Sequence, residues 1–265
     1  MASTSPNPAQ NAARGPDEGE TRAAGPRIAV APDFEWDEQD AYLFDIDGTL
    51  LRSWDRVHYD SFAASVRRIT GFEVTLAGIP TAGSTDTAIL RAACGQAGVP
   101  NEELEKHIDA ILEAMCAGVA ERRQEMRVAL MPGVEETLRY LAGRGKLLGV
   151  ATGNLEVIGW IKIEQAGLRE WFRFGGFSDR FPVRSELVAQ AARKARELAG
   201  TGGLPGARVC VVGDTPRDIE AARANSLPVI SVATGHYSFE QLLELRPEVC
   251  VTSLADLLAL TGRRA

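Results

Sequence analysis

The chain has 265 residues, of which 45% are hydrophobic and 25% charged, as is typical of a soluble globular protein with a sizeable core. Its formal net charge of -7 disfavours nucleic acid as a partner, because the phosphates would be repelled. The sequence shows no signal-peptide core and no run of eighteen apolar residues, so we expect a cytoplasmic protein without a membrane partner. The four cysteines lack metal-ligand or disulfide spacing, and Cys210 and Cys250, which lie in apolar strand-like runs, are interpreted as core residues in a reducing compartment.

The chain divides into three predicted parts. Residues 1–40 are rich in Ala, Pro, Gly and small polar residues and show no apolar period, which predicts a disordered tail. Residues 41–53 and 128–265 are expected to form an α/β core. The segment between them, residues 54–127, is expected to form a helical insert.

A short apolar run over residues 41–44 ends in two carboxylates one residue apart, Asp45 and Asp47. The run predicts a buried strand that carries acidic groups at its carboxyl end, which is where open α/β sheets place their ligands. Two anions this close repel each other unless a cation lies between them or one of them binds a proton. Gly48 permits a tight bend, and the hydroxyl of Thr49 can bond locally to hold it. This stretch therefore indicates an acidic site at a strand end.

Three helical segments follow, over about residues 58–70, 85–97 and 101–124. Their apolar residues recur at helical spacing, and no strand signal separates them. Three helices in succession do not continue an alternating β/α pattern, so an inserted helical subdomain explains them better.

Strands and helices alternate through the rest of the chain. Strands are expected over residues 147–150, 172–177, 208–212, 227–232 and 249–251, and helices over 134–141, 155–166, 185–198, 216–224, 238–245 and 254–260. Such alternation implies right-handed crossovers and a mostly parallel sheet covered on both faces. We therefore predict an α/β fold with a Rossmann-like parallel sheet and an inserted α-helical cap.

Polar residues mark the starts of two of these helices. Thr152, Gly153 and Asn154 place a hydroxyl beside a flexible turn at a helix start, where free N–H groups favour an anion. Taken alone, Thr152 is more simply explained as an N-cap. Arg184 precedes another helix, where a cation opposes the helix dipole and becomes favourable only if an anion lies there too. The alternative for Arg184 is an ordinary solvated arginine.

A last polar stretch, residues 213–218, follows the strand expected over 208–212. A capping box accounts for Thr215 and Asp218, with a proline at the first helical position between them. The capping box leaves Asp214 unexplained. Asp214 is a carboxylate at a strand tip, on the same edge of the sheet as Asp45.

In this order the motifs resemble the four-motif signature of the haloacid dehalogenase-superfamily phosphohydrolases. They are Asp45-Ile46-Asp47-Gly48-Thr49, then Thr152, then Arg184, and finally Gly213-Asp214 with Asp218. The resemblance covers about residues 41–260, and the insert is similar to the cap of the phosphoglycolate phosphatase-like branch. The sequence departs from the family at the third motif, which is usually lysine. Lys162 and Lys194 lie inside predicted helices, on faces expected to be solvated, so Arg184 is the best-placed cation.

The resemblance implies a Mg²⁺-dependent phosphatase that hydrolyses a small phosphorylated metabolite, phosphoglycolate-like or a sugar phosphate, through an aspartyl-phosphate. It implies that Asp45 is the nucleophile and Asp47 the general acid and base. Mg²⁺ would be held by Asp45, the carbonyl of Asp47 and Asp214, with Asp218 supporting its waters. The residues implied to bind the substrate are Gly48, Thr49, Thr152, Gly153, Asn154 and Arg184, of which Thr152 and Arg184 would also stabilise charge in catalysis.

Other chemistries of the superfamily are less well matched. A dehalogenase does not need the carboxylate of Asp47, and mutases usually carry valine where Thr49 stands. Phosphonate cleavage uses a cap lysine, and the only lysine in the insert is Lys106. A receiver-like module phosphorylated on aspartate is the alternative of a different class, but such modules are shorter and lack a helical insert here.

The sequence leaves the substrate open. The loop from Ala82 to Asp86 resembles the substrate-facing loop of the cap, but a simple helix N-cap explains it equally well. His58 and His236 are candidate rim residues, although surface loops or helix faces are the simpler interpretation of both.

Overall fold

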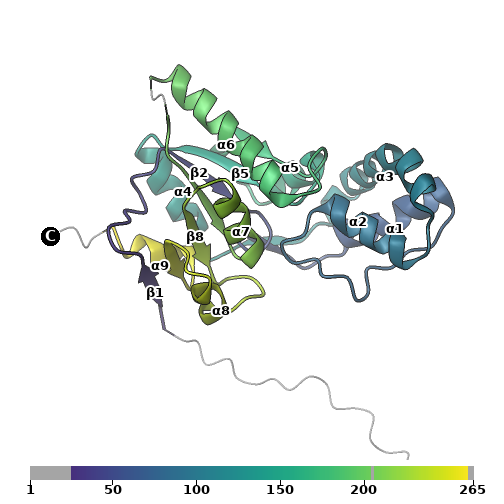
Figure 1. Cartoon of the computed structure of the whole chain (residues 1–265), viewed down its shortest axis with the longest axis horizontal. Helices are drawn as coiled ribbons and strands as arrows, with labels where there is room; N and C mark the ends of the chain where they lie inside the picture. Colours follow the sequence, from purple (N-terminus) through teal and green to yellow (C-terminus); the bar gives the residue numbers. More distant parts are fainter. Residues whose placement is uncertain (1–24, 204–205, 262–265) are drawn as a thin grey trace, which may run out of the picture.

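The structure, a computed structural model, describes residues 25–203 and 206–261. Figure 1 shows a sheet flanked by helices and, to one side of it, a group of helices that forms a cap. The cap contains α1 (Val57–Thr70), α2 (Asp86–Gln96) and α3 (Asn101–Glu121). The predicted α/β fold with an inserted helical part is therefore confirmed.

The central sheet contains seven strands of the described chain, in the order β1-β9-β8-β7-β2-β5-β6. Every neighbouring pair is parallel except β1 with β9. The strands are β1 (Ile28–Val30), β2 (Ala41–Phe44), β5 (Leu147–Ala151), β6 (Phe174–Gly176), β7 (Val209–Gly213), β8 (Val229–Val232) and β9 (Val249–Val251). Since β2 lies between β5 and β7, the residues that follow these three strands meet at one edge.

Helices cover both faces of the sheet because alternate residues of each strand point to opposite sides. In β2, Tyr42 and Phe44 pack on one face, and Ala41 and Leu43 pack on the other. The first face is covered by α4 (Val134–Gly143) and α9 (Leu254–Leu258). The second is covered by α6 (Arg184–Thr201), α7 (Pro216–Ala224) and α8 (Phe239–Glu244).

A two-stranded antiparallel ribbon, β3 (Leu51–Ser53) with β4 (Val128–Leu130), joins the cap to the core. Both chain connections to the cap therefore pass through one narrow element. Two short 3₁₀ turns complete the structure, η1 (Arg123–Glu125) and η2 (Arg169–Trp171).

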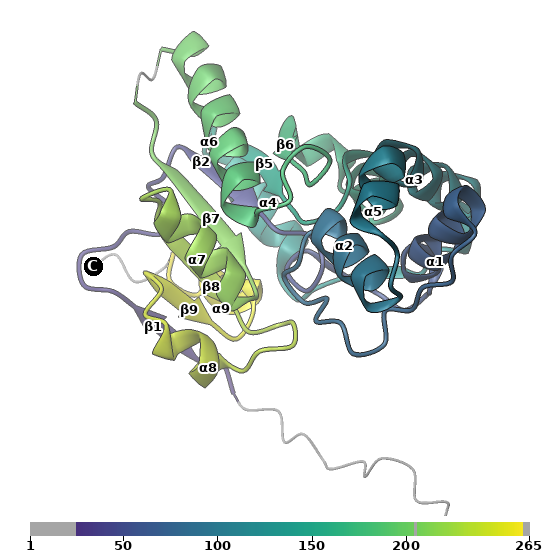
Figure 2. The same cartoon turned by 45° about the vertical axis from the view of Figure 1, so that its right-hand side comes forward.

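One core helix, α5 (Glu156–Gln165), packs against both parts of the molecule. Its Ile158 and Ile161 join the apolar cluster of the cap, while Ile163 joins the cluster of the sheet. Figure 2 shows α5 close to α3, on the cap side of the core. This helix therefore sits at the junction where the site is found.

The expected disordered tail of residues 1–40 is too long. Residues 28–30 form β1 against β9, and Trp36 is buried, whereas residues 1–24 lie outside the described part of the chain. The three residues of β1 are too few to show an alternating apolar pattern, and the strand that pairs with them, β9, lies more than two hundred positions along the chain. The core cysteines Cys210 and Cys250 are fully buried, as expected.

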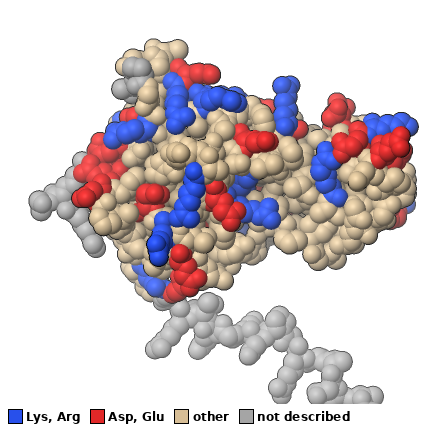
Figure 3. Space-filling view, viewed as in Figure 1, with Lys and Arg blue, Asp and Glu red and all other residues tan. Residues whose placement is uncertain are grey.

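Over the described residues, no helix combines the length and the apolar character needed to cross a lipid bilayer. On the face drawn in Figure 3, acidic and basic side chains are interspersed over both core and cap.

Candidate active site

The predicted site residues converge at the carboxyl ends of three adjacent strands. Asp45 follows β2, Thr152 follows β5, and Asp214 follows β7. The backbone holds these ends in register, since the Asp45 amide donates to the Val212 carbonyl over 2.9 Å. The three residues line a cavity of about 600 Å³ that lies between the core and the cap.

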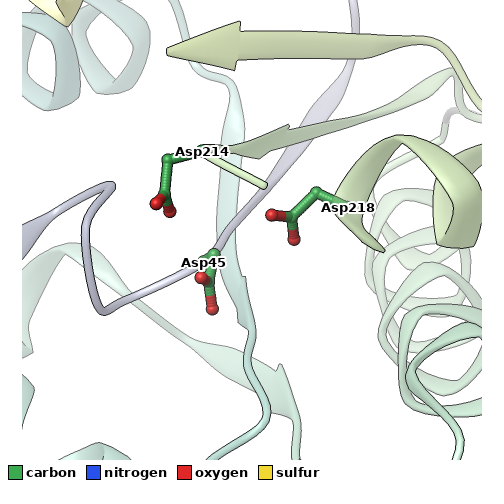
Figure 4. Close-up of side chains that lie close together, drawn as sticks. All are labelled: Asp45, Asp214 and Asp218. Atoms are coloured by element: carbon green, nitrogen blue, oxygen red, sulfur yellow. The ribbon is translucent and has the colours of Figure 1, made fainter. Parts of the chain in front are cut away.

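Three carboxylates lie close together at this edge, those of Asp45, Asp214 and Asp218 (Figure 4). One oxygen from each lies within 4.8 Å of the others, and all three side chains are buried. Buried like charges repel strongly, so this group either binds protons or binds a cation. Carboxylate oxygens are the ligands that hard divalent cations prefer, so the donor set fits Mg²⁺.

The polypeptide around Asp214 is shaped to hold that carboxylate. Thr49 Oγ1 donates to Asp214 Oδ1 over 2.8 Å. Gly48 has φ +89°, and a Cβ there or at Gly235 would overlap the Asp214 carboxylate. Only glycine combines this backbone angle with this approach. The Gly48 and Thr49 of the first motif therefore support the carboxylate of the last.

Asp218 is engaged on both of its oxygens. Thr215 donates to Oδ2 through its amide over 3.0 Å and its hydroxyl over 2.7 Å, and Arg184 donates to Oδ1. The predicted capping box is therefore present. With both oxygens occupied, Asp218 supports the cluster rather than offering it an open ligand.

Arg184 is the first residue of α6 and points into the cluster. Its Nη2 lies 2.8 Å from Asp45 Oδ1 and 2.7 Å from Asp218 Oδ1. Nη1 donates to the Gly83 carbonyl of the cap loop over 3.2 Å. The expectation that this arginine reaches Asp45 is confirmed, and the guanidinium fork serves two carboxylates together.

Net negative charge remains in the cluster, because one guanidinium faces three carboxylates. Burial raises the pKa of Asp45 to about 6 even though Arg184 opposes the shift. Burial, and next the charge of Asp45, raise the pKa of Asp214 well above its usual range. A bound cation would relieve both.

Asp47 points away from this cluster toward a second cation, Lys162. Lys162 Nζ donates to Asp47 Oδ2 over 2.7 Å and to Asn154 Oδ1 over 2.8 Å. Asn154 Nδ2 donates to the same Asp47 oxygen over 2.8 Å. Partial desolvation raises the pKa of Asp47, whose side chain is 44% exposed, but the charge and hydrogen bond of Lys162 and the bond from Asn154 outweigh it, so the pKa is lowered.

The expectation that Lys162 lies on a solvated helix face is wrong. Its side chain is 5% exposed, on the side of α5 that faces the cavity. A signal was present, because Lys162 follows the buried Ile158 by four positions and so falls on the same helix face. Lys194 is only half-buried and donates to the Gly175 carbonyl, outside the residues that line the cavity.

The second motif contacts both the cavity and the cap. Thr152 Oγ1 accepts bonds from the Asn154 amide and from Asn154 Nδ2, which leaves its own hydrogen free to donate. A Cβ on Gly153 would overlap the carbonyl of Ser84 in the cap loop. Thr152 is therefore not the N-cap of α5, since Leu155 occupies that position.

The cap loop from Ala82 to Asp86 caps a helix and also borders the cavity. Thr85 caps α2, with its hydroxyl accepting from the Ala88 amide, and the loop also lines the cavity. The Asp86 amide donates to Gly153 O over 2.7 Å, and Asp86 Oδ2 accepts from the Leu155 amide over 2.9 Å. This loop therefore fastens the cap to the second motif.

Both candidate rim histidines line the cavity. His58 is a helix-face residue, as expected, but it is largely buried, with Nε2 3.1 Å from Asp86 Oδ2. His236 lies in the loop after β8. The cap lysine Lys106 is exposed on α3 and does not line the cavity.

Comparison with known proteins agrees with this geometry. The family of haloacid dehalogenase-like hydrolases matches residues 39–225. The phosphoglycolate phosphatase of Nitrosococcus oceani is 23% identical over 84% of this chain and 96% of its own. That of Pseudomonas savastanoi pv. phaseolicola is 26% identical over 82% of this chain and 77% of its own.

Solved structures share the fold at lower identity. A predicted phosphoglycolate phosphatase from Haemophilus somnus 129PT superposes with a TM-score of 0.57 at 20% identity, covering 84% of this chain and 98% of its own. A predicted phosphatase from Clostridium acetobutylicum gives the same TM-score and identity, covering 79% of this chain and 92% of its own.

Proposed function

The chain belongs to the haloacid dehalogenase-like hydrolase family, and we propose that it is a Mg²⁺-dependent phosphatase of a small phosphorylated metabolite. One observation carries the proposal. Two carboxylates from one strand end face different partners at one cavity: Asp45 faces an acidic cluster whose donor set fits a divalent cation, and Asp47 faces a lysine. A nucleophile and a proton carrier are the two groups that phosphate-ester hydrolysis through an aspartyl-phosphate needs.

In the first step, a carboxylate oxygen of Asp45 attacks phosphorus. Arg184 holds Oδ1 of Asp45, which orients the carboxylate and leaves the second oxygen to react. The new Asp45–phosphorus ester bond forms as the bond to the leaving alcohol breaks. For this step Asp47 must hold a proton against its lowered pKa, and it gives that proton to the departing oxygen, so no alkoxide has to be released.

In the second step, Asp47 acts in its ionised form. It takes a proton from a water molecule, whose oxygen attacks the phosphorus of phosphorylated Asp45. The ester bond breaks, inorganic phosphate leaves, and Asp47 keeps the proton for the next leaving group. Both steps therefore need Asp47 to face the cavity, which agrees with its 44% exposed side chain.

Charge on the transferring phosphoryl oxygens is offset by fixed donors. The free hydroxyl hydrogen of Thr152 and the guanidinium of Arg184 are available at the cavity floor. Asp45, Asp214 and the carbonyl of Asp47 would hold Mg²⁺, with Asp218 behind them. When bound, the ion supplies positive charge that offsets the excess of carboxylates.

The substrate class rests on the size of the cavity and on the relatives. About 600 Å³ suits a small metabolite, and several relatives are named as phosphoglycolate phosphatases. We therefore propose 2-phosphoglycolate or a compound of similar size. Phosphonate cleavage is disfavoured because Lys106 does not line the cavity.

The test is phosphate release by the purified chain from p-nitrophenyl phosphate and then from a panel of phosphorylated metabolites that includes 2-phosphoglycolate. We expect many turnovers with Mg²⁺, loss of activity in EDTA, and recovery when Mg²⁺ is added back. Full activity in metal-free buffer would refute the metal, and a single turnover would support a phospho-aspartate receiver instead.

A further inference from the structure

Lys162 is a buried cation to which the proposed chemistry assigns no role. Its side chain is 5% exposed, and its helix neighbours Ile161 and Ile163 are buried in two different apolar clusters. A buried ammonium group is costly unless specific partners offset the loss of water. The recorded partners of its Nζ are Asp47 and Asn154, both lining the same cavity.

Hydrogen bonds link Lys162, Asn154 and Asp47 to one another, and the donor and acceptor of each bond are fixed. Because Nζ can only donate, it fixes the Asn154 amide with the oxygen toward itself. The Asn154 nitrogen then donates to Asp47 Oδ2 and Thr152 Oγ1. Lys162 therefore places Asn154 as well as contacting Asp47 directly, and Asp47 Oδ2 accepts two bonds from two different side chains.

The two oxygens of Asp47 differ as a result. Oδ2 is occupied, whereas Oδ1 has no recorded hydrogen bond with the residues that the structure describes. A carboxylate held at one oxygen by two donors cannot rotate freely about its terminal torsion. Its free oxygen is then presented to the cavity in one orientation, as proton transfer to a leaving group requires.

We propose that Lys162 is a positioning residue that, together with Asn154, aims Asp47 at the leaving-group oxygen. The role is separate from that of Arg184, which contacts Asp45 and Asp218 in the other half of the site. Lys162 acts through Asp47 and does not itself touch the transferred group. The inference rests on the proposed phosphatase activity and on Asp47 as its proton carrier.

The test compares substrates whose leaving groups need a proton to different degrees. p-Nitrophenolate departs readily without one, whereas the more basic phenolate of phenyl phosphate needs protonation, and the two substrates have similar size. We expect Lys162→Met to lower kcat/KM for phenyl phosphate by ~10²-fold, in the range that positioned acid–base groups contribute, and for p-nitrophenyl phosphate only a few-fold. A merely structural loss would lower both equally.

Two further variants separate this inference from the function on which it rests. Asp47→Asn should show the same selective loss, and Asp47→Asn with Lys162→Met should be no slower than Asp47→Asn alone, because Lys162 acts through that carboxylate. If Asp47→Asn shows no selectivity, the proton-carrier role fails. If Asp47→Asn is selective and Lys162→Met is not, the Lys162 inference alone is overturned.

The matched control is Lys194→Met, which removes a half-buried lysine whose Nζ bonds to a backbone carbonyl outside the cavity. It should leave both kcat/KM values within a few-fold of wild type. Lys162→Gln, a smaller neutral replacement that keeps donor hydrogens, covers the case in which Lys162→Met does not fold. Selectivity in Lys162→Gln supports the proposal, and equal loss on both substrates overturns it.

Discussion

The site has two halves, one around Asp45 and one around Asp47, and each pairs its carboxylate with a cation in a different way. Around Asp45, three acids share one arginine, and burial raises the pKa of Asp45 to about 6. Around Asp47, a single acid is paired with a single lysine, and its pKa is lowered despite partial desolvation. The three carboxylates around Asp45 exceed the charge of the single arginine, and a bound metal ion would offset that excess. The charges of Asp47 and Lys162 balance each other without a metal ion.

The choice of cation follows from what each half must hold. The planar fork of Arg184 bonds to two carboxylates simultaneously and still reaches the cap loop. The ammonium of Lys162 is a compact charge on a flexible side chain, and it donates to one carboxylate oxygen of Asp47 and to the amide oxygen of Asn154. Exchanging the two side chains would therefore not exchange their roles.

The largest expected effect comes from removing the nucleophile. Asp45→Asn should abolish turnover with the fold intact, because an amide cannot form the ester with phosphorus. The measurement is phosphate release, with circular dichroism to check the fold. Asp60→Asn, which changes an exposed carboxylate of α1, is the control and should retain wild-type activity. Near-wild-type turnover by Asp45→Asn would remove the basis for distinguishing the two halves.

The next effect tests the arginine of the acidic half. Arg184→Ala removes charge-assisted bonds worth about 2–3 kcal/mol, which lowers kcat/KM by roughly 30- to 150-fold or more. Arg184→Lys should recover part of the loss, but a point charge cannot reproduce the fork. Unlike Lys162→Met, Arg184→Ala should slow p-nitrophenyl and phenyl phosphate alike.

The control for Arg184 is Arg193→Ala, an exposed arginine on the same helix. It should leave kcat/KM unchanged. If Arg184→Ala were mild while Lys162→Met stopped turnover on both substrates, then Lys162 would be the cation of the third motif, and the assignment of the two halves would be reversed.

A smaller effect is expected where the cap loop meets the second motif. Asp86→Ala loses the bond from the Leu155 amide and the contact with His58. Because the reacting groups stay in place, KM should rise several-fold with kcat little changed. Steady-state kinetics measure this, with the exposed cap residue Asp109→Ala as control. A loss confined to kcat would show that the loop positions chemical groups instead.

The smallest effect is a shift in thermal stability that only the acidic half should produce. With its pKa raised to about 6, Asp45 in the metal-free fold binds protons more readily than in the unfolded chain, whose aspartates titrate near 3.9. The free energy of unfolding therefore falls as the pH rises from about 4 to 6, and the loss persists above that range.

Mg²⁺ should reverse this loss, because it binds the ionised carboxylates. We expect the Mg²⁺-induced rise in Tm to be larger at pH 7.5 than at pH 5.5. Mg²⁺ at ~100 times its Kd adds about 2.7 kcal/mol, which is a shift of several degrees. Asp214→Ala should remove most of the shift at both pH values, while Lys162→Met should keep it. Equal shifts at both pH values would contradict the raised pKa of Asp45.

The acidic half could be predicted from sequence because its members follow strand ends. Parallel strands deliver Asp45, Thr152 and Asp214 to one edge, so the pattern of strands was enough to bring them together. Arg184 was also placed correctly, because a cation at a helix start is unfavourable without an anion beside it.

In the second half, Asp47 and Asn154 were predicted as site residues, but Lys162 was missed because it lies in the middle of a helix. Apolar spacing alone does not show that α5 packs against both core and cap, so the helix face that carries Lys162 was predicted to be solvated. The strand β1 was missed for a similar reason, since three residues are ordered only by a distant partner. The strands β3 and β4 of the ribbon that joins the cap to the core are equally short, so they too show no alternating apolar pattern.

The order of strands in the sheet has a consequence for synthesis of the chain. β2 is complete at residue 44, yet its two neighbours, β5 and β7, are completed only at residues 151 and 213. β1 has to wait still longer, until residue 251 supplies its partner. A nascent chain therefore exposes an apolar strand with two open edges until residue 151 and one open edge until residue 213, a condition that favours aggregation and slow, late closure of the sheet. Conditions that prolong translation or deplete chaperones should reduce the yield of this protein before they affect its activity.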